Sequence, residues 1–80
     1  MVSLGGPIKP AYHEVAHRVR RAITSGKLAP GARLPSESEL CATFEVSRDT
    51  VRRGLLLLAE EGLILGQQGA GWFVAEGQRK

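Results

Sequence analysis

The chain has 80 residues, of which 42% are hydrophobic and 24% charged, so it suits one small folded domain without room for a deep active-site cleft. Cys41 is the single cysteine, which excludes an intrachain disulfide and favours a reducing, cytoplasmic environment. No apolar run approaches the roughly 20 residues of a membrane span. The net charge is +3, and its distribution is uneven because three arginines cluster at Arg48, Arg52 and Arg53 within an otherwise acidic second half.

The first third of the chain predicts an arm and a helix. Residues 1–10 hold two glycines and two prolines and are predicted to form a flexible arm. From Tyr12 to Ile23, apolar residues recur at spacings of three and four, which predicts an amphipathic helix ending at Ser25-Gly26. The segment 32–34 is expected to be short and extended, because the proline that follows it disfavours helical backbone.

Two serines mark the starts of further helices. Ser36 and Glu39 have the spacing of a capping box, which predicts a second helix to about residue 43. Ser47 is a suitable N-cap for a third helix over residues 48–61. Two helices joined by such a short turn are typical of a helix-turn-helix.

A hairpin is predicted after the third helix. Residues 63–65 and 72–74 have the composition of strands, and the glycine-rich residues 66–71 join them as a turn. The order predicts an α+β fold, a small winged helix-turn-helix with three helices, a short strand and a C-terminal hairpin as the wing. This domain is expected to span residues 11–75, with residues 76–80 as a polar tail or the start of a linker.

One motif raises the possibility of a zinc enzyme. His13, Glu14 and His17 spell H-E-x-x-H, in which two histidines on one helix face can hold zinc while the glutamate activates water. A catalytic site also needs a third protein ligand, and the chain has no other histidine. The two histidines are therefore expected to lie on a solvated helix face, and neither a metal nor a cofactor is predicted.

Two other features have simpler interpretations than chemistry. The stretch GQQGAG could suggest a phosphate-binding loop, but such loops open a helix and this one leads into the strand at 72–74. Cys41 lies among apolar residues and is expected to be a small buried side chain rather than a reactive thiol. At least one of Trp72 and Phe73 is expected to pack on the core.

The third helix has the character of a DNA-recognition helix. On a helical wheel of roughly 100° per residue, the core stripe is formed by Val51, Leu55 and Leu58. Arg48 and Arg52 then share the edge beside this stripe at the N-terminal end, whereas Arg53 is turned away from them. Arginine forks can bind O6 and N7 of guanine in the major groove. The alternative is a solvated basic face paired with Asp49 and Glu45.

Several ordered motifs together resemble one family. The stretches LPSESEL, VSRDTVRRGL, EEGLI and QGAGWFV are similar to L-P-S-E-R-x-L, V-S-R-x-T-V-R-x-A-L, E-G-L-I and Q-G-x-G-T-F-V of the DNA-binding domain of the GntR (gluconate repressor) family of bacterial transcription regulators. The resemblance implies base contacts by Arg48, Thr50 and Arg52. It implies backbone contacts by Ser36, Ser38, Ser47, Asp49 and Arg53, and wing contacts by Gln67, Gln68 and Gly69.

The chain departs from this pattern at several positions. Ser38 replaces an arginine of the family, and Glu45 replaces a glycine in the bend between the helices, where a left-handed backbone would cost about 1 kcal/mol. Gly66 and Ala70 stand where basic residues are frequent, so the wing carries no positive charge.

The resemblance implies a repressor domain rather than an enzyme. Such a domain binds an inverted-repeat DNA operator as part of a homodimer, and a larger C-terminal domain binds the small-molecule effector. That domain is absent from this chain, which is expected to be either a fragment or a naturally short regulator. The alternative is a winged helix that binds another protein through Leu56 and Leu57, which are expected to lie outside the core stripe.

Overall fold

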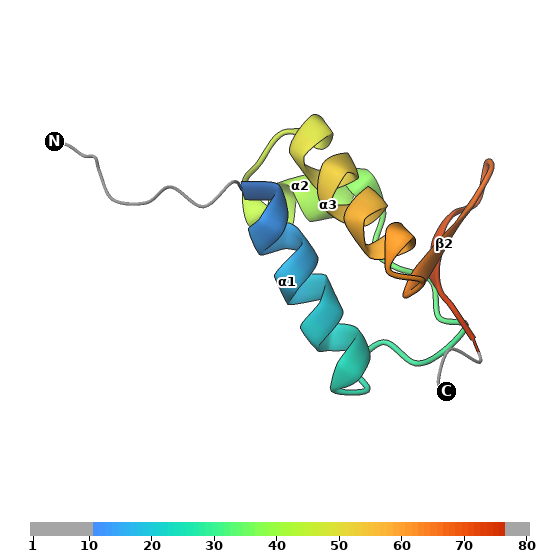
Figure 1. Cartoon of the computed structure of the whole chain (residues 1–80). Coiled ribbons are helices and arrows are strands. Elements are labelled where there is room, and N and C mark those ends of the chain that lie inside the picture. Colours follow the sequence, from blue (N-terminus) through green and yellow to red (C-terminus); the bar gives the residue numbers. More distant parts are fainter. Residues whose placement is uncertain (1–10, 77–80) are drawn as a thin grey trace, which may run out of the picture.

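The computed structural model describes residues 11–76, which form three helices and a two-stranded antiparallel hairpin (Figure 1). The elements in chain order are α1 (Ala11–Thr24), α2 (Glu37–Phe44), α3 (Arg48–Glu60), β2 (Ile64–Gln67) and β3 (Gly71–Val74). The predicted winged helix-turn-helix, including its α+β class, is thereby confirmed. The predicted arm at residues 1–10 lies outside the described residues, as does the predicted tail beyond Glu76.

The starts of α2 and α3 are fixed by the two predicted serine caps. The Ser36 hydroxyl accepts from the Glu39 backbone N–H at 3.0 Å, and the Ser36 N–H donates to the Glu39 carboxylate at 2.8 Å. The Ser47 hydroxyl accepts from the Thr50 backbone N–H at 3.1 Å. Each bond satisfies a backbone donor that the first helical turn leaves without a partner.

The turn between α2 and α3 contains a strained residue. Glu45 ends α2 with φ 58° and ψ 46°, the left-handed conformation that L-residues other than glycine seldom adopt. Its backbone N–H still donates to the Cys41 carbonyl, so the helix end is capped despite the missing glycine. The expected strain at this position is therefore present.

The core lies where α1, α2, α3 and the hairpin meet. Every element contributes buried side chains to it, and the largest that are fully buried are Val15, Val51, Leu55, Leu58, Ile64 and Val74. α1 lies close against α3 at Gly54, where a Cβ would lie 2.8 Å from the Tyr12 carbonyl oxygen. This close approach requires glycine, because any larger residue would press against the α1 backbone.

The two leucines expected outside the core stripe differ from each other. Leu56 is 51% exposed, as expected, but Leu57 is half-buried and packs against the core. The prediction for Leu57 is wrong because α1 covers the flank of α3 that carries Gly54. The buried side of α3 is therefore wider than the predicted core stripe of Val51, Leu55 and Leu58.

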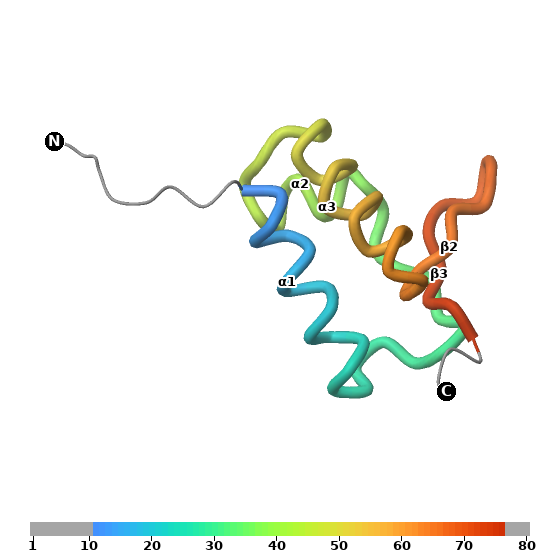
Figure 2. Tube along the Cα trace, viewed as in Figure 1, coloured from blue at the N-terminus to red at the C-terminus, as the bar shows by residue number. Residues whose placement is uncertain are grey.

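The hairpin is joined to the segment before α2. β2 and β3 pair in the register Ile64↔Val74 to Gln67↔Gly71, and Arg33 forms an antiparallel bridge with Phe73. β2 begins one residue later than predicted, because the Leu63 N–H is bonded to the Leu58 carbonyl at the end of α3. Pairing continues to Gln67↔Gly71, so the strands are longer than predicted and the turn is confined to residues 68–70. Figure 2 shows the segment before α2 beside the base of the hairpin.

In residues 11–76, no helix combines the length and apolar character that crossing a membrane requires.

Candidate nucleic-acid interface

A concave surface lies between the N-terminal ends of α2 and α3 and the hairpin. It is lined by Arg33, Leu34, Ser36, Glu37, Ser38, Arg48, Gly66, Gln67, Gln68, Gly69, Gly71 and Trp72. The tip of the hairpin and the start of α3 lie on the same side of the molecule (Figure 1). The fold thereby brings together some of the predicted residues of each part, namely Ser36, Ser38, Arg48, Gln67, Gln68 and Gly69.

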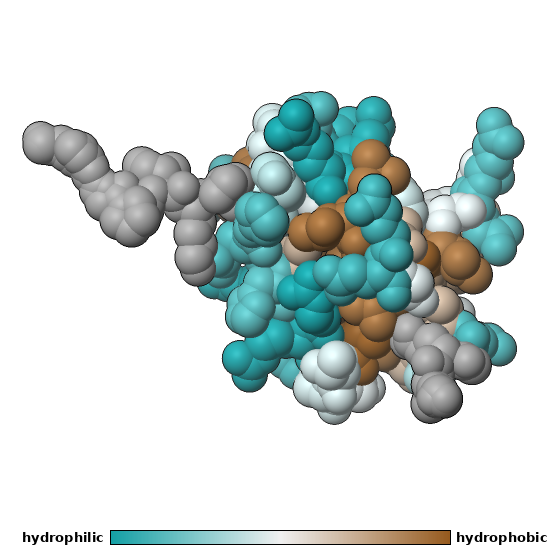
Figure 3. All heavy atoms as spheres, in the orientation of Figure 1, coloured by the Kyte–Doolittle hydropathy of each residue, from teal (hydrophilic) through white to brown (hydrophobic). Residues whose placement is uncertain are grey.

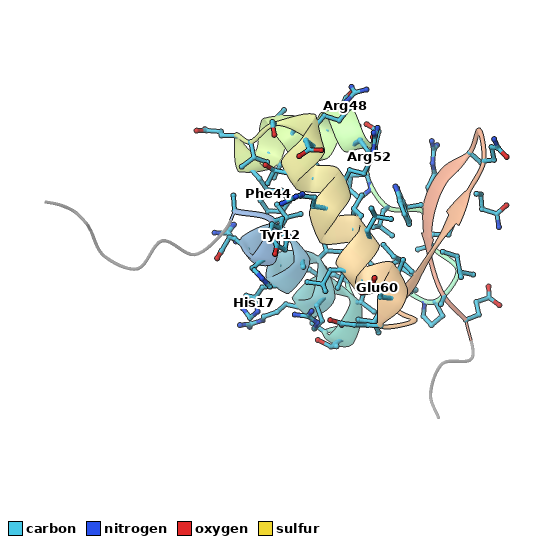
Figure 4. The ribbon with its side chains drawn as sticks, turned by 45° about the horizontal axis from the view of Figure 1, so that its top comes forward. Tyr12, His17, Phe44, Arg48, Arg52 and Glu60 are labelled. Atoms are coloured by element: carbon cyan, nitrogen blue, oxygen red, sulfur yellow. The ribbon has the colours of Figure 1, made fainter. Side chains whose placement is uncertain are left out.

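Two of the three clustered arginines share this side. Figure 4 shows Arg48 and Arg52 at the N-terminal end of α3, on the side away from Tyr12 and His17. Both side chains are exposed. Arg48 Nη2 donates to the Ser38 hydroxyl at 2.8 Å, and Arg52 Nη2 donates to Glu37 Oε1 at 2.9 Å. Arg52 is thus engaged with a carboxylate, whereas Arg48 is held only by a neutral hydroxyl.

The predicted hydroxyl contacts are used in part for helix capping. Ser36 and Ser47 accept backbone N–H bonds at the starts of α2 and α3. The Ser47 hydroxyl also donates to the Thr50 side-chain oxygen at 3.0 Å. The Ser36 and Thr50 hydroxyls act as acceptors in these bonds, so each retains a proton for donation to a phosphate or a base.

The third arginine of the cluster lies on a different flank. Arg53 Cζ is 5.5 Å from the centre of the Tyr12 ring, and its Nε is 3.8 Å from the Asp49 carboxylate. Arg53 lines a shallow depression with Tyr12, Leu56, Leu57 and Glu60. The structure therefore places Arg53 and Asp49 apart from the surface formed by Arg48 and the wing.

Glu37 is a carboxylate at the centre of the basic surface. The hydrogen bond from Arg52 holds the pKa of Glu37 below its usual range, although partial burial acts in the opposite direction. A hydrogen bond from Trp72 and the charge of Arg48 act in the same direction as Arg52. The same bond raises the pKa of Arg52. Glu37 is therefore ionised at neutral pH and offsets the charge of one arginine.

Sequence reasoning missed three residues of this surface, namely Arg33, Glu37 and Trp72. Arg33 lies against the wing, since a Cβ at Gly71 would be 3.3 Å from Arg33 Nε. Trp72, which packs on the core as expected, donates its indole N–H to Glu37 Oε2 at 3.3 Å. These contacts join segments distant in sequence, so no local pattern indicates them; only the adjacency of Arg33 to the LPSESEL motif was a signal.

The H-E-x-x-H residues lie on α1. His13 and His17 are exposed, and the His13 ring stacks on Tyr12 with ring centres 4.4 Å apart. Within residues 11–76, no three His, Cys, Asp or Glu side chains are grouped closely enough to hold a metal ion. The motif is thus a pair of histidines beside Glu14, which forms an ion pair with Arg18 at 3.3 Å.

Sequence comparison identifies a family and several relatives. The family model for "Bacterial regulatory proteins, gntR family" matches residues 11–74. The chain is 46% identical over 68 residues to the mannosyl-D-glycerate transport/metabolism system repressor MngR of Escherichia coli K12, and 46% identical over 67 residues to the histidine utilization repressor of Klebsiella aerogenes. These matches cover 85% and 84% of this chain but 28% of each relative, so the chain spans little more than a quarter of their length.

Solved structures with the same fold include complexes with DNA. The DNA-binding domain of AraR in complex with operator ORR3 superposes with a TM-score of 0.84 at 37% identity, covering 94% of this chain and 92% of that one. The same domain in complex with operator ORE1 gives a TM-score of 0.86 at 37% identity, covering 94% and 93% of the two chains.

Proposed function

The chain belongs to the gntR family of bacterial regulatory proteins, and from that premise we propose that it is the operator-binding domain of a transcriptional repressor. The observation that carries the proposal is the joining of Arg48, Arg52, the start of α2 and the wing on one surface. The AraR domain, which binds operators, has the same fold at 37% identity. The proposed function is binding rather than catalysis.

Each element of the surface has its own task in this proposal. α3 enters the major groove, where Arg48 and Arg52 read bases with Thr50 beside them. The hydroxyls of Ser36 and Ser38 donate to phosphates near the helix N-termini, where the backbone also favours anions. The Ser47 hydroxyl does so by exchanging its bond to the Thr50 side chain for one to a phosphate. The wing residues Gln67, Gln68 and Gly69 lie along the adjacent minor groove.

Three residues outside the α3 arginine pair complete the proposed contacts to the DNA backbone. Arg33 adds to the wing the positive charge that the hairpin itself lacks, because its guanidinium lies over Gly71. Arg53 and Asp49 flank the entry of α3 into the groove, with Arg53 reaching a phosphate on the Tyr12 side. These contacts position the domain without reading sequence.

The whole regulator is proposed to act as a homodimer. The domain proper covers residues 11–75, and a larger C-terminal domain of the full regulator binds a small effector and brings two copies together. A two-fold dimer presents two α3 helices, so the operator is an inverted repeat with half-sites about one helical turn apart. The isolated domain binds weakly because it loses the gain from linked binding.

Selection from random double-stranded DNA at a stated salt concentration tests the proposal. The chain as given and a fusion of it to a two-fold dimerising module are expected to enrich the same half-site. The fusion is expected to enrich it as an inverted repeat. The Arg48→Ala/Arg52→Ala variant is the matched control and should enrich nothing. Equal enrichment by wild type and control would contradict the proposed surface, and tight binding of a single half-site by the monomer would contradict the dimer.

A further inference from the structure

Glu37 is an unexpected side chain on a surface proposed to face a polyanion. It lies in the first turn of α2 and its side chain is 22% exposed. Both of its oxygens are used: Oε1 accepts from Arg52 Nη2 at 2.9 Å, and Oε2 accepts from Trp72 Nε1 at 3.3 Å. A carboxylate at this position repels phosphate, which is unfavourable for DNA binding. Its two hydrogen bonds suggest that Glu37 offsets this cost by positioning other residues.

The bond from Trp72 joins the hairpin to α2 and α3. Trp72 is opposite Gly66 in the β2–β3 register, and a Cβ at Gly66 would lie 3.2–3.5 Å from three carbons of the indole ring. The ring therefore lies across the hairpin over Gly66, where any added side chain would be a tight fit. From this position its N–H reaches Glu37, which in turn holds the Arg52 fork.

Both members of this hairpin pair depart from the family pattern in a complementary way. Trp72 stands where the pattern has threonine, and Gly66 stands where basic residues are frequent. In this chain the hairpin thus carries a ring with a hydrogen-bonded partner in the helical body, and no charge at Gly66. An uncharged wing has little long-range attraction to DNA, so its contribution depends on being held in position before binding.

We propose that Trp72 and Glu37 form a wing anchor, a pair of positioning residues. They fix the position of the hairpin relative to Arg52, the arginine proposed to contact a base. The inference rests on the proposed function, because it assigns the wing's contribution to DNA affinity to this link. The anchor itself touches no base. It sets where Gln67 and Gln68 lie relative to the groove that α3 enters.

The Trp72→Phe change removes the indole N–H while keeping a ring over Gly66. We expect affinity for the selected half-site to fall on the order of five- to tenfold, which corresponds to the loss of one typical hydrogen bond. In a Gln67→Ala/Gln68→Ala background the same change should have a clearly smaller effect, because the side-chain contacts of the wing that it positions are already absent. An equal fold-loss in both backgrounds would overturn the anchor.

The Glu37→Gln change distinguishes the Glu37–Arg52 bond from the Glu37–Trp72 bond. It keeps the side-chain shape but removes the charge that holds Arg52, so discrimination between cognate and scrambled DNA should fall by several-fold. Trp72→Phe should leave that discrimination nearly unchanged, since the Arg52 bond remains. Equal discrimination by Glu37→Gln and wild type would show that Glu37 does not position the arginine.

Amide hydrogen exchange in the free chain tests the anchor without DNA. We expect the amides of β2 and β3 to exchange several-fold faster in Trp72→Phe, whereas those of α1 keep their wild-type rates. Arg53→Ala is the control and should leave the hairpin unchanged. Unaltered hairpin exchange in Trp72→Phe would overturn the anchor. If the exchange difference between wild type and Trp72→Phe is found but the wild-type chain selects no DNA sequence, the proposed function is overturned instead.

Discussion

At the scale of single residues, the three clustered arginines are distinguished by their partners. Arg48 is held by the Ser38 hydroxyl, Arg52 by the Glu37 carboxylate and Arg53 by the Tyr12 ring. A guanidinium fixed by one carboxylate still has N–H groups to present to a base, because arginine carries five donors. Arg48 and Arg52, the proposed base contacts, therefore differ from Arg53, the proposed phosphate contact, in their position on the helix and in their partners.

Removing Arg52 and Arg53 should therefore have different consequences for DNA binding. Arg52→Ala is expected to cost about 1–3 kcal/mol on the cognate site and to relax the preference at one base pair. Arg53→Ala should weaken all sequences alike and lower the slope of log K against log salt by about 1. Fluorescence anisotropy at three salt concentrations, with cognate and scrambled DNA, measures both effects. A change of base preference in Arg53→Ala alone would reverse the two roles.

Arg33 should account for the salt dependence of the wing. Arg33→Ala is expected to lower the salt slope by about 1 on cognate and scrambled DNA alike, because a phosphate contact carries no sequence information. Arg33→Lys keeps the charge and should keep the slope. Gln67→Ala or Gln68→Ala should hardly change it, because neither side chain is charged. The same anisotropy titration applies, and a slope equal to wild type in Arg33→Ala would exclude the phosphate contact.

At the scale of elements, the apolar side of α3 determines how the helices pack. Gly54 lets α1 approach α3, and this approach leaves Leu57 half-buried. Leu56, which lines the same depression beside Tyr12 and Arg53, stays exposed. The space-filling view of Figure 3 shows apolar residues exposed at the surface among polar ones over α3.

Substituting the two neighbouring leucines provides a matched pair. Leu57→Lys is expected to lower the free energy of unfolding by roughly 1–2 kcal/mol, because it places a charge against the core. Leu56→Lys should change it by less than about 0.5 kcal/mol, as at most exposed positions. Urea denaturation of both variants measures the difference. Equal losses would mean that Leu56 is as firmly packed as Leu57.

The sequence predicted the elements better than it predicted their contacts. The starts of α2 and α3 depend on the Ser36–Glu39 and Ser47–Thr50 bonds, which span three residues and are visible as local spacing. The link between Glu37 and Trp72 depends on how the hairpin folds back onto α2, and no spacing encodes it. The burial of Leu57 likewise follows from the approach of another helix.

At the scale of the whole molecule, the H-E-x-x-H pair lies away from the proposed DNA-binding surface. Figure 4 shows His17 on α1, on the opposite side of the domain from Arg48 and Arg52. The arrangement separates a solvated α1 face from the face formed by α2, α3 and the wing. Changes to the histidines should therefore leave both fold and DNA binding intact.

Zinc binding provides the direct measurement. Calorimetric titration with zinc is expected to give no micromolar or tighter site, because a catalytic zinc needs three protein ligands and the α1 pair supplies two. The His13→Ala/His17→Ala variant should match wild type in thermal unfolding and in operator affinity. Tight zinc binding that disappears in this variant would restore the metal-site interpretation.

The pairing of the hairpin with the segment before α2 has a consequence for the order of folding. The Leu34 N–H donates to the Trp72 carbonyl at 2.8 Å and the Val74 N–H donates to the Ala32 carbonyl at 2.8 Å, so these bonds close a loop that contains α2 and α3. Closing so long a loop is entropically costly until its interior is structured. We therefore expect α2 and α3 to form first and the wing to dock last, which makes the wing the final part of the domain to become competent for its operator.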